Sequence, residues 1–191
     1  MRKNLPVTDN EKTFSPNQKL ISSTDLKGKI RHSNSAFVEV SGFTRDELIG
    51  QAHNIIRHPD MPPSVFKLMW DTINAGKPWM GVVKNRSRNG DHYWVDAYVT
   101  PIKTDGKVNE YQSVRRKAKP EFVKRAEQVY QALNQQRDGN HRQQRGAHQY
   151  HEQQRRIYSS GRHRVQAVLL RERNAGRQRD AESHARSGLH L

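Results

Sequence analysis

The sequence predicts an α+β fold in which a five-stranded antiparallel sheet carries short helices packed on one face. Two strand-forming segments near the start of the chain are separated from three later ones by a block of short helical segments. This order favours one antiparallel sheet with the helices gathered on one side of it. The strongest local signal is Asn89-Gly90, which lies between two strand-forming runs. Asn-Gly tolerates the positive φ of a tight hairpin turn and is typical of a β-hairpin.

The chain begins with residues 1–17, which we expect to form an extended or disordered cap. They contain Pro6 and Pro16 and few apolar side chains. Residues 19–24 follow as a short strand candidate, and residues 30–33 continue as the second strand of a hairpin. Asp25 and Gly28 between them are residues that turns favour.

Several short helices follow the first hairpin. Ser33 or Asn34 is placed to cap a helix over residues 36–40, which Gly42 would end. Thr44 and Glu47 have the spacing of a capping box, in which a hydroxyl and a carboxylate each accept an amide hydrogen at the start of a helix. Residues 51–57 are expected to form a helical turn or a loop.

A longer helix is predicted after residues 58–63, His-Pro-Asp-Met-Pro-Pro. Asp60 is a candidate for its N-terminal cap, and proline is tolerated in a first helical turn because no amide donor is needed there. Its apolar residues recur at helical spacing; they are Val65, Phe66, Met69, Trp70 and Ile73. Gly76 and Pro78 end it.

Residues 79–102 form the hairpin around Asn89-Gly90. After the turn, Tyr93 and Val95 alternate with Trp94 and Asp96, as expected for a strand with two different faces. Its dense aromatic residues are consistent with a core or with a sheet face that cups a flat ligand. A fifth strand over residues 108–114 and a helix over residues 121–133 complete the pattern.

Composition excludes several classes of function. The 191-residue chain has no cysteine, which removes disulfides, thiolate metal sites and cysteine nucleophiles. No apolar run approaches the roughly 20 residues that cross a bilayer, and no signal peptide begins the chain. Neither a P-loop nor a catalytic triad motif is present, so we do not expect an enzyme.

Residues 134–191 differ sharply from the rest. They contain 12 arginines, 9 glutamines and 6 histidines but no lysine. An arginine-rich arm could bind nucleic acid, although only Tyr150 and Tyr158 are available for base stacking. Our alternative hypothesis is a disordered remnant of a shifted reading frame. We therefore divide the chain into a cap (1–17), a folded domain (18–117), a helical linker (118–133) and this tail (134–191).

The ordered set of short motifs resembles a PAS domain. The matching segments include residues 34–43 (Asn-Ser-Ala-Phe-Val-Glu-Val-Ser-Gly-Phe), residues 57–62 (Arg-His-Pro-Asp-Met-Pro) and residues 93–95 (Tyr-Trp-Val). The last two favour the flavin-binding PAS domains of bacterial aerotaxis receptors over light-sensing flavin domains. The resemblance covers about residues 5–116.

This resemblance implies a cupped PAS sheet that holds a noncovalent FAD and reports redox state or oxygen in chemotaxis signalling. It also implies a HAMP-type or chemoreceptor signalling module as partner, a possible PAS–PAS dimer, and a cytoplasmic location in receptors anchored to the inner membrane. Haem is a less favoured cofactor. Light-sensing flavin domains bond a cysteine to the flavin, and that chemistry is impossible in a chain without cysteine.

Four candidate cofactor residues lie near the predicted 51–63 loop. The Arg57 guanidinium suits a phosphate, or a surface salt bridge to Asp60 or Glu47. His58 either donates to the cofactor or orders its own turn, and His53 lies on the same rim or in an exposed loop. Asp60 is a helix cap in either case.

The other four candidates lie elsewhere in the chain. Asn85 occupies a mid-strand position that disfavours asparagine, so it either meets the flavin edge or holds a solvent-facing or bulge position. Asn34 is a helix cap with a possible second role in the pocket. Trp79 and Phe66 either wall the flavin ring or belong to the core.

Overall fold

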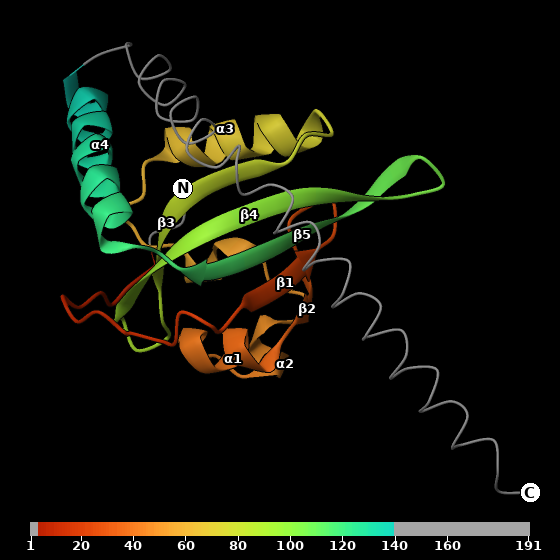
Figure 1. Ribbon diagram of the computed structural model, residues 1–191, viewed down its shortest axis with the longest axis horizontal. Helices are drawn as coiled ribbons and strands as arrows, with labels where there is room; N and C mark the ends of the chain where they lie inside the picture. Colours follow the sequence, from red (N-terminus) through yellow and green to blue (C-terminus); the bar gives the residue numbers. More distant parts are fainter. Residues whose placement is uncertain (1–3, 140–191) are drawn as a thin grey trace, which may run out of the picture. The chain divides into compact units, whose positions relative to one another are not determined.

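A computed structural model of the chain describes residues 4–139, which contain one five-stranded antiparallel sheet of order β2-β1-β5-β4-β3 (Figure 1). The strands are β1 (Leu20–Thr24), β2 (Ile30–Ser33), β3 (Trp79–Arg86), β4 (His92–Thr104) and β5 (Lys107–Lys117). β3 pairs with β4 around the Asn89-Gly90 turn, with Asn85 opposite Tyr93. The predicted α+β fold and all five strands are confirmed.

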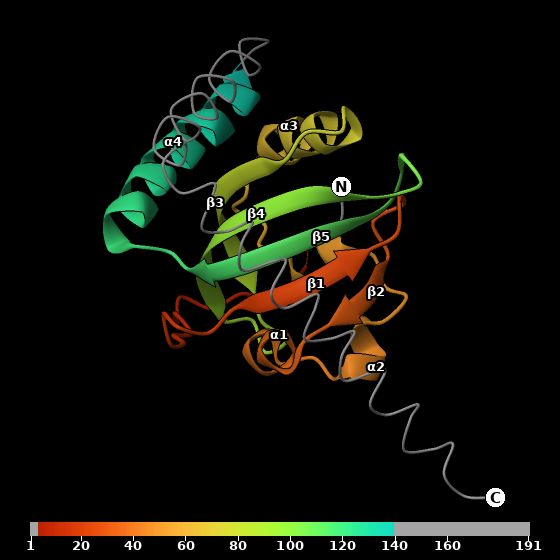
Figure 2. The same cartoon turned by 45° about the vertical axis from the view of Figure 1, so that its right-hand side comes forward.

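Four short helical segments line one side of the sheet. They are α1 (Ser35–Ser41), α2 (Arg45–Leu48), the 3₁₀ helix η1 (His53–Ile56) and α3 (Pro63–Asn74). Both views place α1 and α2 beside β1 and β2, and α3 beside β3 (Figures 1 and 2). The largest buried side chains, including Phe37, Leu48 and Trp79, lie in this core cluster.

The last helix, α4 (Pro120–Gly139), packs on the opposite face of the sheet. The ring of Tyr130 stacks on Trp94 at 6.5 Å, and its hydroxyl donates to the carbonyl of Val82. Asn134 Nδ2 donates to the carbonyl of Asp60 at 2.8 Å. The helix predicted over residues 121–133 is therefore present and packed on the sheet, and it continues past the compositional boundary at residue 134.

Helix caps follow the sequence signals at two sites. Asn34 caps α1, since its Oδ1 accepts from the amides of Phe37 and Ile21 at 3.0 Å each, while Nδ2 donates to the carbonyl of Lys19 at 2.8 Å. Thr44 and Glu47 form the predicted capping box.

The cap expected from Asp60 is not formed. α3 has Pro62 at its N-cap and no side-chain cap, and the chain needs none there because a proline starts the helix. The Asp60 carboxylate instead pairs with Lys84 Nζ at 2.8 Å. Asp60 therefore connects the start of α3 to the edge strand β3.

The N-terminal segment is extended and follows the β3–β4 hairpin. The Thr8 amide donates to the carbonyl of Gly90 at 3.0 Å, the Lys12 amide donates to that of His92 at 2.7 Å, and the His92 amide donates to that of Asn10 at 3.0 Å. These bonds occupy backbone groups that an exposed hairpin would leave to water.

Two histidines meet beneath this segment. The His58 side chain is 3% exposed, its Nδ1 accepts from the Asp60 amide at 3.2 Å, and its ring meets that of His92 edge to face at 6.0 Å. Burial, assisted by the nearby Lys84 ammonium, lowers the pKa of His58 to about 4. His58 is therefore a neutral imidazole at neutral pH.

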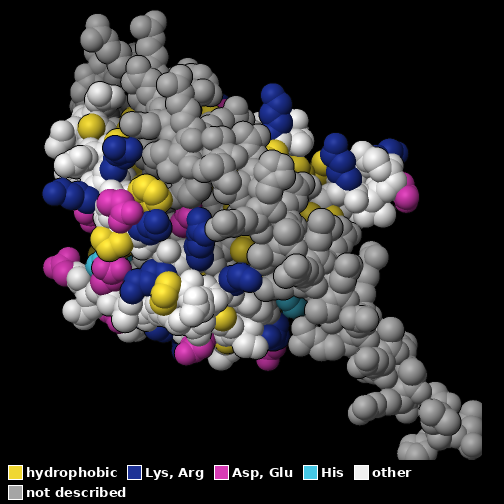
Figure 3. Space-filling model, in the orientation of Figure 1, with side chains coloured by type: hydrophobic (Ala, Val, Ile, Leu, Met, Phe, Trp, Pro, Cys, Tyr) yellow, Lys and Arg dark blue, Asp and Glu magenta, His cyan; other side chains and the backbone are white. Residues whose placement is uncertain are grey.

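The surface of the described domain carries both signs of charge. On the face in Figure 3, Lys and Arg side chains lie between Asp and Glu side chains without forming a single basic area. Within residues 4–139 no helix is long and apolar enough to cross a membrane.

A methyl group at Gly81 is expected to destabilise the domain. A Cβ there would lie 2.6 Å from Cη2 of the buried Trp79 ring, so the indole would have to shift. Gly81→Ala should lower the free energy of unfolding by about 1–3 kcal/mol, measured by urea denaturation. In a Trp79→Leu background the same change should cost far less; equal costs in both backgrounds would disprove the clash.

Acid is expected to destabilise the domain through His58. Its pKa is about 4 in the folded chain and about 6.5 in an unfolded chain, so the unfolded state binds more protons between these values. Stability should therefore fall as pH decreases through this window, by up to ~1.4 kcal/mol per pH unit for one group.

His58→Asn retains an acceptor for the Asp60 amide but does not titrate. Denaturation curves from pH 7 to 4 should show a shallower loss of stability for this variant than for the wild-type chain. Parallel stability profiles would show that His58 does not carry the effect.

Candidate functional site

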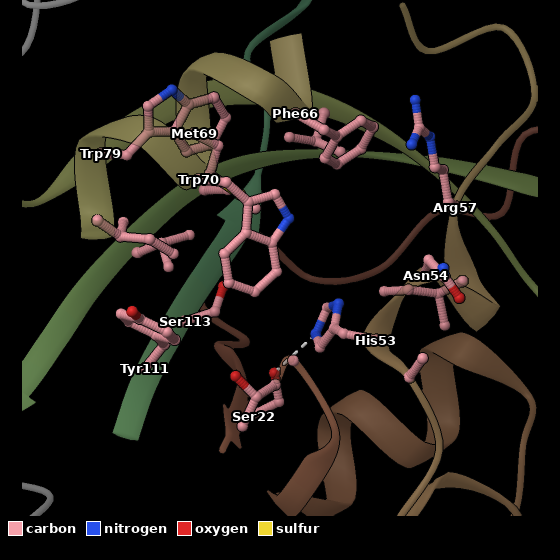
Figure 4. A pocket seen from close by; sticks show the side chains of 18 of the residues that line it. Ser22, His53, Asn54, Arg57, Phe66, Met69, Trp70, Trp79, Tyr111 and Ser113 are labelled. Atoms are coloured by element: carbon pink, nitrogen blue, oxygen red, sulfur yellow. Dashed lines mark hydrogen bonds between the residues drawn. The ribbon is translucent and has the colours of Figure 1, made fainter. Parts of the chain in front are cut away.

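A cavity of about 210 Å³ lies between the sheet and the helical segments η1 and α3 (Figure 4). Its volume is several times the roughly 30 Å³ occupied by one water molecule, so it is more than a packing defect. Its walls come from β1, β3, β4 and β5, from α3, and from the segment around η1. The lining residues used below are Ser22, His53, Asn54, Arg57, Phe66, Met69, Trp70, Trp79, Asn85, Tyr111, Ser113 and Arg115.

One side of the cavity is apolar. Phe66, Met69 and Trp70 reach it from α3, and Trp79 reaches it from β3 (Figure 4). Trp70 meets the Tyr111 ring edge to face at 5.7 Å, which holds the indole in place. Flat side chains on one wall and the sheet on the other suit a planar, aromatic ligand.

Asn85 places an amide in this apolar surrounding. Its side chain is 4% exposed, lies in the cavity lining, and makes no hydrogen bond to the other described residues. The Nε1 of Trp79 is likewise buried without an acceptor. Burying the Trp79 Nε1 without an acceptor costs about 1–3 kcal/mol, and the Asn85 amide offers a donor and an acceptor to the cavity, so both groups favour a polar ligand. The alternative of a solvent-facing Asn85 is wrong.

Arg57 lies at the side of the cavity, and its side chain is fixed by two contacts. Its guanidinium stacks on Phe66 at 3.9 Å, and Nη2 donates to the carbonyl of Met61 at 3.2 Å, while Nε has no acceptor among the described residues. Burial lowers the pKa of Arg57 to about 10, so it stays charged. The alternative salt bridges are not formed, because Asp60 pairs with Lys84, and Glu47 with Arg88.

The N-terminal segment supports this part of the wall. Asn4 Nδ2 donates to the carbonyls of Asn54 and Arg57, at 2.7 and 2.9 Å. The backbone of Arg57 also forms an isolated antiparallel bridge with Asn85 of β3. The candidate residues Arg57 and Asn85, far apart in the sequence, are thereby brought side by side.

Elsewhere in the lining, His53, Ser22 and Arg115 form a hydrogen-bonded chain. His53 Nε2 lies 3.0 Å from Ser22 Oγ, and Arg115 Nη2 donates to the same oxygen. Since Ser22 accepts from Arg115, its own hydrogen is free to be donated to His53. Burial, with the Arg115 charge, lowers the pKa of His53 to about 3, so the imidazole is neutral.

Arg115 was missed by sequence analysis, which named no site residue in the last strand. The alternation of Tyr111, Ser113 and Arg115 along β5 would have placed these side chains on one face. The sequence did not show which face of β5 meets the cavity, because Arg115 and its neighbour Arg116 are both arginines and lie on opposite faces. Arg115 is 2% exposed, whereas Arg116 points outward and pairs with Asp96 at 3.0 Å.

Of the eight predicted residues, the cavity lining includes five: His53, Arg57, Phe66, Trp79 and Asn85. Asn34, His58 and Asp60 do not line it. The amide of Asn34 is fully used in tying α1 to β1, His58 is turned toward His92, and the Asp60 carboxylate points to Lys84.

The chain was compared with protein families and with curated proteins. Residues 30–115 match the family model of the PAS fold. The aerotaxis receptor of Escherichia coli K12 is 48% identical over 128 residues, which are 67% of this chain and 25% of that receptor. The nitrogen fixation regulatory protein of Klebsiella pneumoniae is 30% identical over 97 residues, 50% of this chain and 20% of that protein. The chain thus spans 25% of the length of the aerotaxis receptor and 20% of that of the nitrogen fixation regulatory protein.

Among solved structures, a study titled "Flavin Analogue Sheds Light on Light-Oxygen-Voltage Domain Mechanism" contains a similar chain, with a TM-score of 0.53 and 16% identity. The match covers 64% of this chain and 90% of that one. At this identity the likeness shows the fold alone. Together with the family match and the aligned receptor sequence, it shows that residues 30–115 form a PAS domain, similar to that of the aerotaxis receptor.

Proposed function

We propose that this PAS domain senses redox state or oxygen through a noncovalently bound FAD and relays that state within an aerotaxis-receptor-like signalling protein. The observation that carries the proposal is a cavity with aromatic walls that contains buried polar groups without partners. The similarity to the aerotaxis receptor and to a structure whose title names a flavin supports the same assignment.

The residues of the cavity fit a flavin in three respects. Phe66, Trp70 and Trp79 supply flat apolar surface for the ring. The Asn85 amide offers both a donor and an acceptor to a ring edge that carries carbonyls and N–H groups. The Arg57 guanidinium at the side of the cavity suits a pyrophosphate, which would extend from the ring.

When bound, a flavin supplies a ring whose charge and hydrogen-bonding pattern change with its oxidation state. Asn85 would respond to that change by altering its hydrogen bonds, and it is part of β3. The preceding residue, Lys84, faces the other side of the sheet and pairs with the Asp60 carboxylate. The backbone carbonyl of Asp60 in turn accepts a hydrogen bond from Asn134 of α4. β3 therefore connects the cavity to α4, the direction in which we propose the signal travels.

Haem is a weaker candidate for this cavity. His53 is the histidine in its lining, and its Nε2 already lies at hydrogen-bond distance from Ser22. A haem iron needs such a nitrogen lone pair free. A cysteinyl adduct of the kind formed in light-sensing flavin domains is excluded because the chain has no cysteine.

The nucleic-acid alternative is not favoured. It rested on the arginine-rich residues 134–191, which lie outside the described residues except for 134–139. On the described surface, the face in Figure 3 mixes both signs of charge. We propose instead a HAMP-type or chemoreceptor module as partner, with a sensory, non-enzymatic role on the cytoplasmic side.

The full-length chain, incubated with FAD and freed of excess ligand, should keep a flavin absorption spectrum. Denaturation should then release FAD in a ratio close to one per chain, measured by chromatography. A chain that stays colourless after reconstitution would contradict the proposed function.

Asn85→Ala should weaken FAD binding by about 5–30-fold, because hydrogen bonds worth about 1–2 kcal/mol are lost without changing the fold. Arg57→Gln should weaken it by roughly 10–100-fold through loss of a charge-assisted contact. Fluorescence titration measures both. Asn109→Ala and Arg88→Gln alter exposed residues and should bind as wild type; equal affinities for all four variants would remove Asn85 and Arg57 from the site.

A further inference from the structure

Arg115 is a buried cation that the described part of the chain leaves without a counter-ion. It lies in β5, opposite Leu20 of β1 and Ala97 of β4, with strands on both sides. Its side chain is 2% exposed and lines the cavity. No carboxylate of residues 4–136, whose side chains the structure describes, lies within salt-bridge distance of it.

The Arg115 guanidinium is fixed by two contacts, but two of its nitrogens lack hydrogen-bond acceptors. Nη2 donates to Ser22, and the group lies 4.4 Å above the Phe37 ring, whereas Nε and Nη1 have no acceptor. Burial lowers the pKa of Arg115 only to about 10, so the charge is present at neutral pH. Leaving a buried charge uncompensated costs several kcal/mol, which a ligand with an anionic or strongly accepting group would recover.

The neighbouring groups do not supply a negative charge. The Tyr93 hydroxyl, which interacts electrostatically with Arg115, is buried without a hydrogen-bond partner, and burial raises the pKa of this phenol above its ordinary value. His53 is held neutral. This side of the cavity therefore presents a positive charge and unused donors to whatever is bound.

The depth of Arg115 indicates which part of a flavin it would meet. Arg57 is only partly buried and lies at the side where a charged phosphate tail could reach solvent. Arg115 is enclosed between the central strands, so we expect it to meet an edge of the ring and not an extended tail. A flavin ring that gains two electrons and one proton carries one negative charge, located on the N1–C2=O edge.

We propose that Arg115 binds this ring edge and stabilises its reduced, negatively charged form over the neutral oxidised form. The inference rests on the proposed flavin function and goes beyond it, because it assigns to one residue the redox level at which the sensor responds. A cation that binds the reduced form more tightly must raise the midpoint potential of the bound cofactor, by linkage. Arg57, which we place at the phosphate, would contribute equally to the binding of oxidised and reduced FAD and would leave the midpoint potential unchanged.

The test compares the full-length chain with Arg115→Gln and with its neighbour control, Arg116→Gln. Arg116 lies on the outer face of the same strand, so its variant changes net charge equally without touching the cavity. Spectroelectrochemical titration with bound FAD gives the midpoint potential. Arg115→Gln should reduce the preference for the reduced form at least tenfold, about 30 mV for a two-electron couple, while Arg116→Gln leaves the potential unchanged.

Thermal unfolding without FAD separates this role from a structural one. Because Arg115 is an uncompensated buried cation, the apoprotein of Arg115→Gln should be at least as stable as wild type. Equal potentials for the two variants, or an Arg115→Gln apoprotein that does not fold, would overturn the inference while leaving the proposed function intact. A wild-type chain that takes up no FAD would overturn both.

Discussion

The alternation of side chains along the central strands divides the chemistry of this domain between two faces. On β3, Trp79, Val83 and Asn85 point into the cavity, while Val82 and Lys84 face α4. A shift of register by one residue would exchange these sets and put a lysine in the cavity. Strand register is thus the constraint on which both the site and the packing of α4 depend, and the antiparallel pairing of β3 with β4 sets it.

The cavity combines two properties that a folded chain does not need for its own stability. Its aromatic walls leave empty volume, and some of its polar atoms, including Trp79 Nε1 and Arg57 Nε, lack partners within the described residues. Each property costs free energy in the absence of a ligand. Such unfavourable features are tolerated where a bound ligand compensates for them. The empty volume between aromatic walls matches the flat ring of a flavin, and the unpartnered polar groups match its polar edge.

Much of the fold was predictable because the signals are local. Asn89-Gly90, the Thr44–Glu47 capping box and the Asn34 cap each involve residues close in sequence, and all three formed as predicted. Asp60 was misassigned because a proline already started α3, leaving the carboxylate free to pair with Lys84 across the fold. The sequence contains no sign of that distant partner.

The sequence by itself determined the element order and the PAS fold of residues 30–115, because strand alternation, turns and motifs are short-range patterns. Five of the eight residues proposed from the resemblance line the cavity. Only the tertiary structure decided that Arg115 faces the cavity and Arg116 the solvent. It also decided that His58 meets His92, and that α4 packs on the sheet. These outcomes depend on which face of a strand a distant helix covers, and that is a property of the assembled core.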